Sequence, residues 1–287
     1  MGYDNRCRDN ASQKEEHRAP IIGYHRAPLT QKFGAPRQPN LVAVTSIIEM
    51  SSPYDTPAAF IGLEAFSHIW VSWQFHHNYI DKDNRLNKTD SGFRPQVRPP
   101  RLGGNQKIGV FASRSMYRPS ALGLSVVKLE RIEIIEGRAL LVISGADMID
   151  ATPIIDIKPY IAYSDAITYA ESGFAPAAPV SLDVTLTESA SQQFINLVNR
   201  GQVNKSITEA TDTKSVTISA RLQQIQSQLL ASDIDTIKAL IAQDPRPAYR
   251  RDDTKTSFVM RYKSIDVTFR LVESRSLQIT DMVEVRG

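Results

Sequence analysis

The sequence has a single cysteine among its 287 residues, Cys7, which lies in a polar N-terminal segment. One cysteine has no partner within the chain, so an internal disulfide framework and a cysteine-rich zinc site are both excluded. No apolar run approaches the roughly 18 residues that a membrane-spanning helix needs. The N-terminus is polar and lacks the apolar region of a signal peptide. These absences predict a cytoplasmic protein that does not bind a membrane.

A strong excess of charge of either sign is also missing. The chain has 34 lysines and arginines against 31 aspartates and glutamates, which gives a formal net charge of +3. Hydrophobic residues make up 41% and charged residues 23%, the usage of an ordinary globular protein. A disordered polyelectrolyte, a collagen-like chain and a histone-like protein are therefore excluded, and the net charge alone identifies no partner.

Glycine is scarce in the second part of the chain, since 12 of the 14 glycines lie in residues 1–173. Before this point, short runs rich in Val, Ile and aromatic residues alternate with turn residues, as in β-strands. Strands at such short spacing favour a barrel or a sandwich over alternating strands and helices. The segment 81–104 is long, polar and proline-containing, which is typical of a functional or disordered loop. The expected strands cover residues 21–24, 41–50, 68–75, 107–112, 122–135 and 139–144.

The chain beyond residue 173 has a different pattern. Residues 174–180 are rich in alanine and proline and are interpreted as a linker. Helices are expected at 189–199, 220–230 and 234–242, and strands within 257–285. The last helix ends where Asp244-Pro245 cannot continue it. The sequence therefore predicts a mainly β protein with a polar leader at 1–19, a β-barrel catalytic domain at 20–173 and a smaller α+β C-terminal domain at 181–287.

The five histidines do not form a pattern that binds a metal ion. His76 and His77 are adjacent, and neighbouring residues of a strand point to opposite faces, which is poor geometry for a shared metal. No HExxH or Cys/His spacing supports a zinc site. We therefore expect no metal, with one of the two histidines packed in the protein and the other lining a cleft.

Positive charge is concentrated in residues 85–118. Eight lysines and arginines there face only Asp90, which gives a local charge of +7, whereas residues 119–173 carry −4. Phe93, Tyr117, several prolines and a Gly-Gly pair are interleaved with the basic residues. Arginine binds phosphate through two hydrogen bonds and stacks on bases, so this composition is typical of a loop that binds RNA. A solvated basic loop is the alternative interpretation.

An acidic and aromatic cluster follows the basic segment, and it comprises Asp147, Asp150, Asp156, Lys158, Pro159 and Tyr160. Turn-forming aspartates and a surface ion pair would explain it in purely structural terms. The functional interpretation is a rim of hydrogen-bond acceptors and an aromatic ring at the mouth of a barrel. No GxGxxG, Walker or GxSxG sequence is present, so the usual nucleotide-binding loops and the hydrolase elbow are missing.

Five ordered sequence blocks resemble the TrmO family, also called the YaeB-like or TsaA-like family. Their order and spacing match over roughly residues 20–170, and DPRPAY at 244–249 resembles the start of the C-terminal domain of the bacterial family. The blocks are APRQP at 35–39, GLEAFSHIW at 62–70, VRPPRLGGN at 97–105, GVFASRS at 109–115 and TPIIDIKPY at 152–160.

The resemblance implies a tRNA methyltransferase that uses S-adenosylmethionine, is built on a β-barrel rather than a Rossmann sheet, and acts as a homodimer. It implies methylation of the exocyclic N6 of N6-threonylcarbamoyladenosine, adjacent to the anticodon at position 37 of the tRNA. By the same resemblance, the cofactor contacts fall on Pro36, Arg37, Gln38, His76, His77, Arg114, Leu124, Ile149, Asp150, Ala151 and Thr152.

The sequence departs from the family pattern in three places. The usual Arg-Pro-Asn-Pro-Ile-Gly stands here as RPSALG at 118–123, the common Asp-Gly-Thr-Pro as DATP at 150–153, and the expected His-Gln as His76-His77. Alanine in place of glycine is strained if the backbone there has a positive φ. Two other interpretations stay open: a non-catalytic RNA-binding barrel that has lost cofactor affinity, and a small-molecule methyltransferase or hydrolase on the same barrel.

Methyl transfer from a sulfonium is an in-line displacement, so the protein mainly aligns donor and acceptor and excludes water. The adenine amine is a poor nucleophile because its lone pair is delocalised into the ring. We expect Asp156 and the Pro159 carbonyl to accept hydrogen bonds from this amine while Tyr160 stacks on the base, by analogy with the Asp-Pro-Pro-Tyr sequence of unrelated adenine methyltransferases.

The threonyl carboxylate of the modified base adds a negative group that an arginine fork could bind. Arg114, Arg118 and Arg246 are the candidates for this contact, with Arg246 reaching a neighbouring site in the dimer. Arg98, Arg101 and Lys158 complete the expected tRNA-binding residues.

Overall fold

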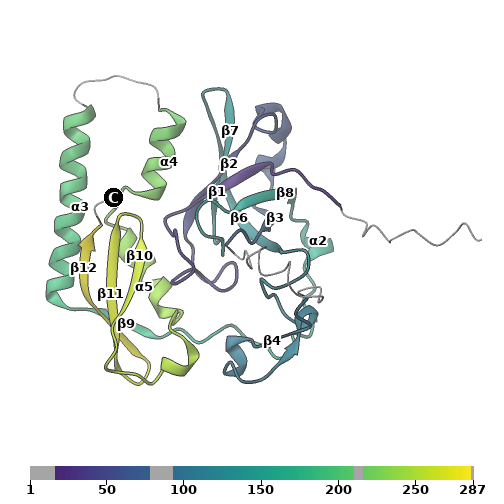
Figure 1. The fold of residues 1–287 in the computed structure, drawn as a ribbon. Helices are drawn as coiled ribbons and strands as arrows, with labels where there is room; N and C mark the ends of the chain where they lie inside the picture. Colours follow the sequence, from purple (N-terminus) through teal and green to yellow (C-terminus); the bar gives the residue numbers. More distant parts are fainter. Residues whose placement is uncertain (1–16, 78–92, 210–215, 286–287) are drawn as a thin grey trace, which may run out of the picture.

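A computed structural model describes residues 17–77, 93–209 and 216–285 of the chain. It consists of a closed barrel and, beside it, a sheet covered by helices (Figure 1). Most of the leader and the segment 78–92, which includes Arg85 and Lys88 of the basic run, lie outside the described residues. None of the described helices is long and apolar enough to cross a membrane.

Six strands close the barrel, and each hydrogen-bonds antiparallel to its neighbours. In their order around the barrel they are β1 (Gly23–Arg26), β2 (Thr45–Met50), β7 (Arg138–Ser144), β6 (Leu122–Ile135), β3 (His68–Gln74) and β8 (Pro153–Pro159). The predicted mainly β barrel is therefore confirmed.

The alternation of side chains explains which strand faces point into the barrel. Along β3, Ile69, Val71 and Trp73 are buried and pack in the barrel core, while the residues between them are only half-buried. Strand β7 instead is buried on both faces over Ala139–Ser144. Its outer face, with Leu140 and Val142, is covered by a helix from the C-terminal part of the chain. A strand covered on both sides has a nearly continuous apolar sequence.

Two expectations for this region are wrong in detail. Residues 107–112 do not form one strand: β5 (Ile108–Gly109) pairs only with β4 (Gln96–Val97), and a 3-10 turn follows it at Val110–Ala112. Strand β8 was not expected, because its two prolines and Asp156 are typical of a turn. The remaining short elements of this part are η1 (Pro57–Phe60), η2 (Leu63–Ala65), η3 (Pro100–Leu102) and α2 (Ala162–Asp165).

The C-terminal part is the expected α+β unit. Its sheet has the order β10 (Phe258–Tyr262), β11 (Ile265–Glu273), β12 (Ser276–Glu284) and β9 (Asp183–Leu186), with β9 parallel to β12. Its helices are α3 (Glu188–Glu209), α4 (Ile218–Gln226) and α5 (Asp233–Ala242), and a 3-10 turn, η5, spans Ala248–Arg250. Strand β9 was not expected, and α3 is longer than the predicted helix 189–199.

The core of the C-terminal sheet also contains residues from the start of the chain. Leu29, Val42 and Val44 are buried in one cluster with the apolar side chains of α5 and β10–β12, and Phe33 and Ala35 pack against that cluster. The backbone N–H of Lys263 donates to the Pro28 carbonyl at 2.7 Å. Residues 29–44 therefore belong to this core by packing, although they precede the predicted domain boundary by more than a hundred positions.

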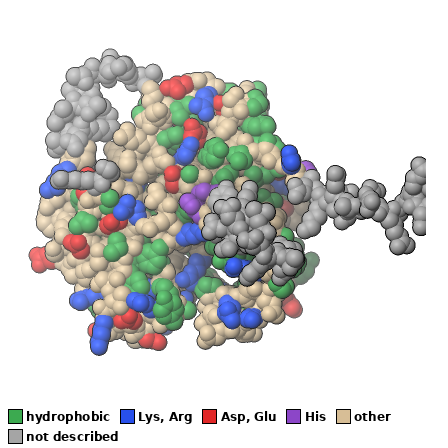
Figure 2. Space-filling model, in the orientation of Figure 1, with side chains coloured by type: hydrophobic (Ala, Val, Ile, Leu, Met, Phe, Trp, Pro, Cys, Tyr) green, Lys and Arg blue, Asp and Glu red, His purple; other side chains and the backbone are tan. Residues whose placement is uncertain are grey.

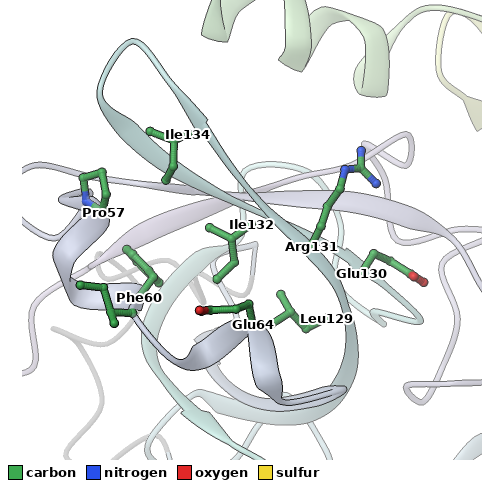
Figure 3. A pocket seen from close by; sticks show the side chains of 9 residues that line it. Pro57, Phe60, Glu64, Leu129, Glu130, Arg131, Ile132 and Ile134 are labelled. Atoms are coloured by element: carbon green, nitrogen blue, oxygen red, sulfur yellow. The ribbon is translucent and has the colours of Figure 1, made fainter.

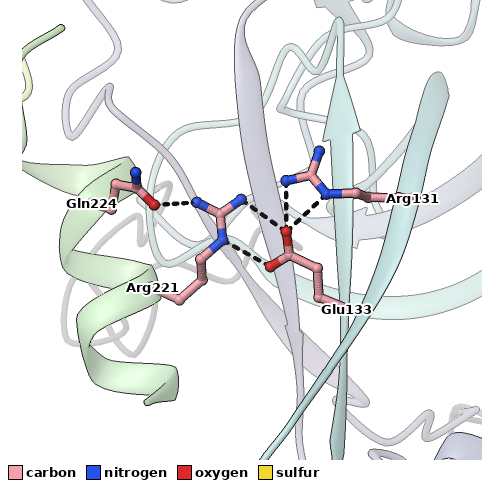
Figure 4. Close-up of polar contacts among 4 residues, drawn as sticks. All are labelled: Arg131, Glu133, Arg221 and Gln224. Carbon is pink, nitrogen blue, oxygen red and sulfur yellow. Dashed lines mark hydrogen bonds and ion pairs between the residues drawn. The ribbon is translucent and has the colours of Figure 1, made fainter. Parts of the chain in front are cut away.

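Helix α4 joins the C-terminal part to the barrel. Ile218 and Ile225 of this helix pack with Ile47, Leu140 and Val142 on the outside of β2 and β7. Beside this contact, Glu133 on β6 binds Arg221 of α4 at 2.7 Å and Arg131 of its own strand at 2.6 Å (Figure 4). The apolar contact and the ion pair together fix the helix on the barrel wall.

Two alanines have left-handed backbone conformations, Ala121 with φ 53° and Ala151 with φ 60°. They lie in two of the three stretches where the sequence departs from the family pattern. In this conformation the Cβ atom comes too close to the following carbonyl oxygen, which costs about 1–2 kcal/mol for an ordinary residue. Ala151 therefore has the positive φ at which alanine in place of glycine is expected to be strained.

We predict that Ala151→Gly raises the free energy of unfolding by about 0.5–1 kcal/mol. Glycine removes the steric cost of the positive φ, while its greater conformational entropy in the unfolded state offsets part of this gain. Chemical denaturation of the two proteins measures the difference. Ala170→Gly is the matched control, since Ala170 is exposed and has no positive φ; that change should lower stability slightly. A lower stability of Ala151→Gly would contradict the prediction.

His25 on β1 is a polar residue inside the barrel wall, 1% exposed. Its Nδ1 lies 3.1 Å from the Ile149 carbonyl and its Nε2 lies 2.8 Å from Ser46 Oγ. Burial lowers the pKa of His25 to about 4, against the favourable effects of the Ile149 carbonyl and the Asp150 charge. The folded protein therefore holds this ring neutral at pH values where the unfolded chain protonates it.

The pH dependence of stability follows from this difference. The unfolded state binds the proton near pH 6.5 and the folded state only near pH 4, so stability falls as the pH drops between these values. The loss attributable to His25 is about 3 kcal/mol. We predict that urea unfolding of His25→Gln between pH 7 and pH 4.5 shows a smaller decrease in stability than the wild type. An equal decrease would contradict the assignment.

Candidate functional site

Hydrogen bonds and electrostatic interactions link four segments that are distant in sequence. The four segments are the loop with Pro36, Arg37 and Gln38, the turn after β3 with His76 and His77, the turn after η4 with Arg114, and residues 149–152 between β7 and β8. Arg114 Nη1 donates to Gln38 Oε1 at 2.6 Å, which joins two of the segments across 76 positions. Figure 2 shows histidine side chains at the surface between the two parts of the molecule, next to lysine and arginine side chains.

The turn 149–152 is held by hydrogen bonds from three directions. The Asp150 N–H donates to the Leu29 carbonyl at 2.7 Å, and the Ala151 N–H donates to the His25 carbonyl at 2.8 Å. The Asp150 carboxylate accepts from the Ala27 N–H at 2.9 Å and from Gln226 Nε2 at 2.8 Å. Within the turn, Thr152 Oγ1 donates to the Ile149 carbonyl at 2.8 Å. The turn is therefore preorganised without a ligand.

The rings of His76 and His77 lie beside each other, with centroids 4.2 Å apart. The expectation that they point to opposite faces of a strand is wrong, because β3 ends at Gln74 and the pair lies in the following turn. Burial, the neighbouring His77 and Lys32 lower the pKa of His76, while the Gln74 carbonyl and the Asp150 charge oppose the shift. Lys32 Nζ donates to the His77 carbonyl at 3.3 Å. Burial therefore favours the neutral form of the His76 ring.

The residues present suit S-adenosylmethionine, the cofactor that the sequence resemblance implies. The Nε2 atom of His76 is buried and has no hydrogen-bond partner among the described residues. A buried polar atom of this kind is costly unless a ligand or water binds it. Arg114 supplies a cation for a carboxylate, and Gln38 and the backbone of 149–152 supply groups that can bind an adenine edge.

Asp147 adds a half-buried carboxylate next to these segments. It accepts a hydrogen bond from Ser125 Oγ at 2.6 Å, and Ser125 in turn accepts from Trp73 Nε1 at 3.0 Å. Burial raises the pKa of Asp147, and the Ser125 hydrogen bond and the Arg114 charge oppose this effect. The Asp147 carboxylate therefore interacts both with Ser125, which binds Trp73 of the barrel core, and with the charge of Arg114.

The expected catalytic residues lie on the outer face of the adjacent strands. Leu124 on β6 pairs with Ser72 on β3, and Ser72 pairs with Asp156 on β8, so the three form one row across the sheet. Leu124 is 55% exposed and Asp156 is also exposed. This row brings one expected cofactor contact and one expected catalytic residue to the same surface.

Tyr160 follows the end of β8 and belongs to an aromatic group. Its ring centroid lies 6.1 Å from that of Trp70 and 6.3 Å from that of His68. Because β8 is extended rather than a turn, the Cα atoms of Asp156 and Pro159 lie about 10 Å apart. The two acceptors can meet one amine only if the Asp156 side chain leans along the strand. Their joint role stays a prediction.

The described part of the basic segment combines arginines with exposed aromatic rings. The Arg94 guanidinium lies 4.9 Å from the ring centroid of Tyr117, and that of Arg118 lies 5.5 Å from the ring of Phe111. Phe111 is 67% exposed. Arg98 and Lys158 are also exposed, and Arg101 donates to the Ala177 carbonyl. The surface therefore offers cations and stacking faces side by side.

Arg246 has a different environment from the other expected substrate-binding residues. It is 1% exposed and binds Asp244 through Nε at 2.7 Å and Nη2 at 3.3 Å. Its Nη1 is buried without a partner among the described residues. The Arg246 carbonyl accepts from Arg37 at 3.4 Å, so within one chain Arg246 already lies behind the loop 36–38.

A hollow of about 470 Å³ lies elsewhere, between η1, η2 and the bent end of β6 (Figure 3). Phe60, Leu129, Ile132 and Ile134 give it an apolar lining, and Glu64 faces it. None of the expected site residues lines this hollow. No group of three or more His, Cys, Asp or Glu side chains within the described ranges could hold a metal ion.

Sequence reasoning missed two of the residues that hold the site, Gln226 and His25, and named the third, Asp147, only as part of the acidic and aromatic cluster. Gln226 and His25 bind the turn 149–152, and Asp147 connects Ser125 to the charge of Arg114. Gln226 follows the turn by 76 positions and gives no sequence signal. A histidine within the short apolar strand β1 was the one available hint, since a buried polar side chain there needs hydrogen-bond partners.

Family models match both parts of the chain. The family model described as "tRNA-methyltransferase O N-terminal domain" matches residues 24–166, and the "TrmO C-terminal domain" matches residues 212–285. A putative S-adenosylmethionine-dependent methyltransferase RcsF from Pseudomonas aeruginosa is 36% identical over 267 residues, which cover 93% of this chain and 97% of that protein.

A further relative is the tRNA (adenine(37)-N6)-methyltransferase of Escherichia coli (strain K12), 32% identical over 88% of this chain and 92% of that protein. The crystal structure of TrmO from Pseudomonas aeruginosa superposes with a TM-score of 0.66 at 29% identity, and the match covers 94% of this chain and 99% of that one. Sequence and fold agree over both parts of the molecule, and the chain therefore belongs to the TrmO family.

Proposed function

We propose that this protein transfers a methyl group from S-adenosylmethionine to N6 of N6-threonylcarbamoyladenosine at position 37 of a tRNA. The relative from Escherichia coli is named for methylation of adenine 37 at N6. The observation that carries the proposal is the Arg114–Gln38 hydrogen bond at 2.6 Å. It joins two of the expected cofactor segments, and in a third segment the buried Nε2 of His76 has no hydrogen-bond partner among the described residues.

The cofactor supplies a methyl group on a positively charged sulfur, which leaves by in-line displacement. In our proposal Arg37, Gln38, Arg114 and the backbone of 149–152 bind the cofactor, and neutral His76 hydrogen-bonds to it through Nε2. A neutral ring suits this role because a protonated one would repel the sulfonium. Leu124 provides apolar contact from the outer face of β6. These contacts fix the position of the methyl donor. The rate of transfer then depends on how the acceptor base is oriented toward it.

The base is proposed to bind on the outer face of β3 and β8. Tyr160, beside Trp70 and His68, offers a stacking surface, and Asp156 is an exposed acceptor on the same strand. An acceptor that binds the amine hydrogens localises the lone pair and raises the nucleophilicity of N6. The proton released after transfer can then pass to Asp156 or to water.

The tRNA backbone is proposed to bind along the segment 93–118. Arg94 and Arg118 lie over aromatic rings there, and Arg98 is exposed for phosphate contacts. Arg114 or Arg118 would bind the threonyl carboxylate by charge-assisted hydrogen bonds. A homodimer and a cytoplasmic location remain part of the proposal, but Arg246 is 1% exposed and paired with Asp244 of its own chain, so it is not proposed to serve a neighbouring site.

We predict that Asp156→Ala lowers kcat at least a hundredfold while the Kd for S-adenosylmethionine changes less than threefold, because the carboxylate acts on the acceptor and not on the donor. Single-turnover methylation and calorimetry measure the two quantities. Glu171→Ala is the control, since Glu171 is an exposed acid of the same part of the chain. Normal turnover of Asp156→Ala would remove its catalytic role.

We further predict that tRNA carrying N6-threonylcarbamoyladenosine accepts the methyl group at least tenfold faster than the unmodified transcript. The physical reason is the lost arginine–carboxylate contact in the unmodified tRNA. Mass analysis of the nucleosides after incubation identifies the product. Equal rates would exclude recognition of the carboxylate, and no methylated nucleoside with either tRNA would favour a non-catalytic RNA-binding barrel.

A further inference from the structure

The C-terminal part of the chain contacts both segments that carry the expected cofactor residues. Gln226 on α4 donates to the Asp150 carboxylate at 2.8 Å. On the other side, the carbonyls of Asp244 and Arg246 accept long hydrogen bonds from Arg37 Nη2, at 3.5 and 3.4 Å. All three of these C-terminal residues lie within 212–285, the range that matches the family's C-terminal domain.

The loop 36–38 also rests directly on the C-terminal sheet. Phe33 and Ala35 pack against its core, and Phe33 stacks at 6.2 Å on Phe269. Gly34 has φ 91°, and a Cβ atom there would clash with the side chain of Met260. The backbone that leads into the loop is therefore pressed against β10, and only glycine fits the contact.

The Asp244–Arg246 ion pair fixes the two carbonyls that face Arg37. Asp244 has φ 49°, and its carboxylate binds Arg246 at 2.7 Å and Arg251 at 3.6 Å. Arg246 is buried, so the pair is shielded from solvent and holds one geometry. The ion pair therefore fixes the backbone of residues 244–246, and the carbonyls of Asp244 and Arg246 face the loop 36–38.

We propose that Gln226 and Asp244 are positioning residues for S-adenosylmethionine: through Asp150 and Arg37, the C-terminal domain holds the two cofactor segments in their binding geometry. The inference rests on the proposed function, since it takes 36–38 and 149–152 as the cofactor segments. A segment that is already ordered loses less entropy when the ligand binds. Release of either anchor therefore weakens cofactor binding and leaves the chemistry at saturating cofactor unchanged.

The first test uses Gln226→Leu in the full-length protein, with Gln223→Leu as the matched control. Gln223 lies on the exposed side of the same helix. Calorimetric titration with S-adenosylmethionine should give a Kd three- to tenfold higher for Gln226→Leu, about the effect of one hydrogen bond, and an unchanged Kd for the control. The midpoint of thermal unfolding without cofactor should be the same for both variants, which separates positioning from loss of structure.

The route through Asp150 is tested by a double-mutant cycle. In the Asp150→Ala background, Gln226→Leu should change the Kd by less than twofold, because the acceptor oxygen that Gln226 Nε2 binds is absent. A full effect in that background would show that Gln226 acts elsewhere. In steady-state kinetics, Gln226→Leu should raise KM for the cofactor and leave kcat within twofold of the wild type.

The second anchor is tested by Asp244→Asn, which removes the charge that fixes Arg246. Its matched control is Asp266→Asn, since Asp266 pairs with Arg261 at 2.5 Å within β10 and β11. The Kd should rise three- to tenfold for Asp244→Asn and stay unchanged for the control. Because Asp244→Asn leaves a buried arginine without its partner, its folding is checked by circular dichroism, and Gln226→Leu tests the inference even if this variant unfolds.

The outcomes separate the inference from the proposed function. A wild-type protein that binds S-adenosylmethionine, together with an unchanged Kd in Gln226→Leu, overturns the inference alone. A wild-type protein that gives no binding overturns the proposed function and the inference with it. Equal losses of affinity in Gln226→Leu and Gln223→Leu also overturn the inference, because the effect would then not pass through Asp150.

Discussion

Closure of the barrel through β1 is the constraint on which the remaining structure depends. This strand has four residues, yet it pairs with β2 on one edge and with β8 on the other. Without it the sheet would have two open edges, with unpaired backbone groups on each. Because His25 of this strand also holds the carbonyl of Ile149, closure and the shape of the turn 149–152 arise from the same residues.

The candidate site follows from this closure and from a second layer of packing. The chain leaving β1 passes Asp150, enters the core of the C-terminal sheet at Leu29, and returns to the barrel at Thr45, where β2 begins. Between these points Gln38 accepts a hydrogen bond from Arg114, and Arg37 donates one to the Arg246 carbonyl. The site is therefore composed of loops, but each loop is fixed by packed elements on both sides, which is the arrangement that ligand binding requires.

The electrostatic pattern is distributed over the same surface. The carboxylates of Asp147 and Asp150, both half-buried, lie near Arg114 and His76 respectively. The small net charge of +3 conceals the separation of charge along the chain, since +7 in residues 85–118 is offset by −4 in residues 119–173. Positive potential at the loop and acceptors at the strand suit a polyanion whose base is modified.

Much of the fold was predictable because period-two alternation and turn residues are local signals. They found β3, β6 and β7 and the three C-terminal strands, and helical spacing found α4 and α5. Strand β8 was missed because its register with β3 overrides the turn preference of its prolines and aspartate. Strand β9 was missed because four residues carry too little pattern. Residues 29–40 look like an ordinary loop, and residues 41–44 were wrongly predicted as the start of a strand. Both pack into the core of a sheet that forms more than 200 positions later, so local sequence does not show their burial.

The candidate site, like the fold, was predictable from the sequence only in part. Its residue types, in five ordered blocks, determined the family, and the alternation of apolar residues determined a mainly β barrel. Only the tertiary structure decided that Gln38 meets Arg114, that Gln226 holds Asp150 and that Arg37 reaches the Asp244 carbonyl. The physical reason is that strand and helix periodicity arises from neighbouring residues, whereas these contacts join segments up to 207 positions apart, as Arg37 and Asp244 do.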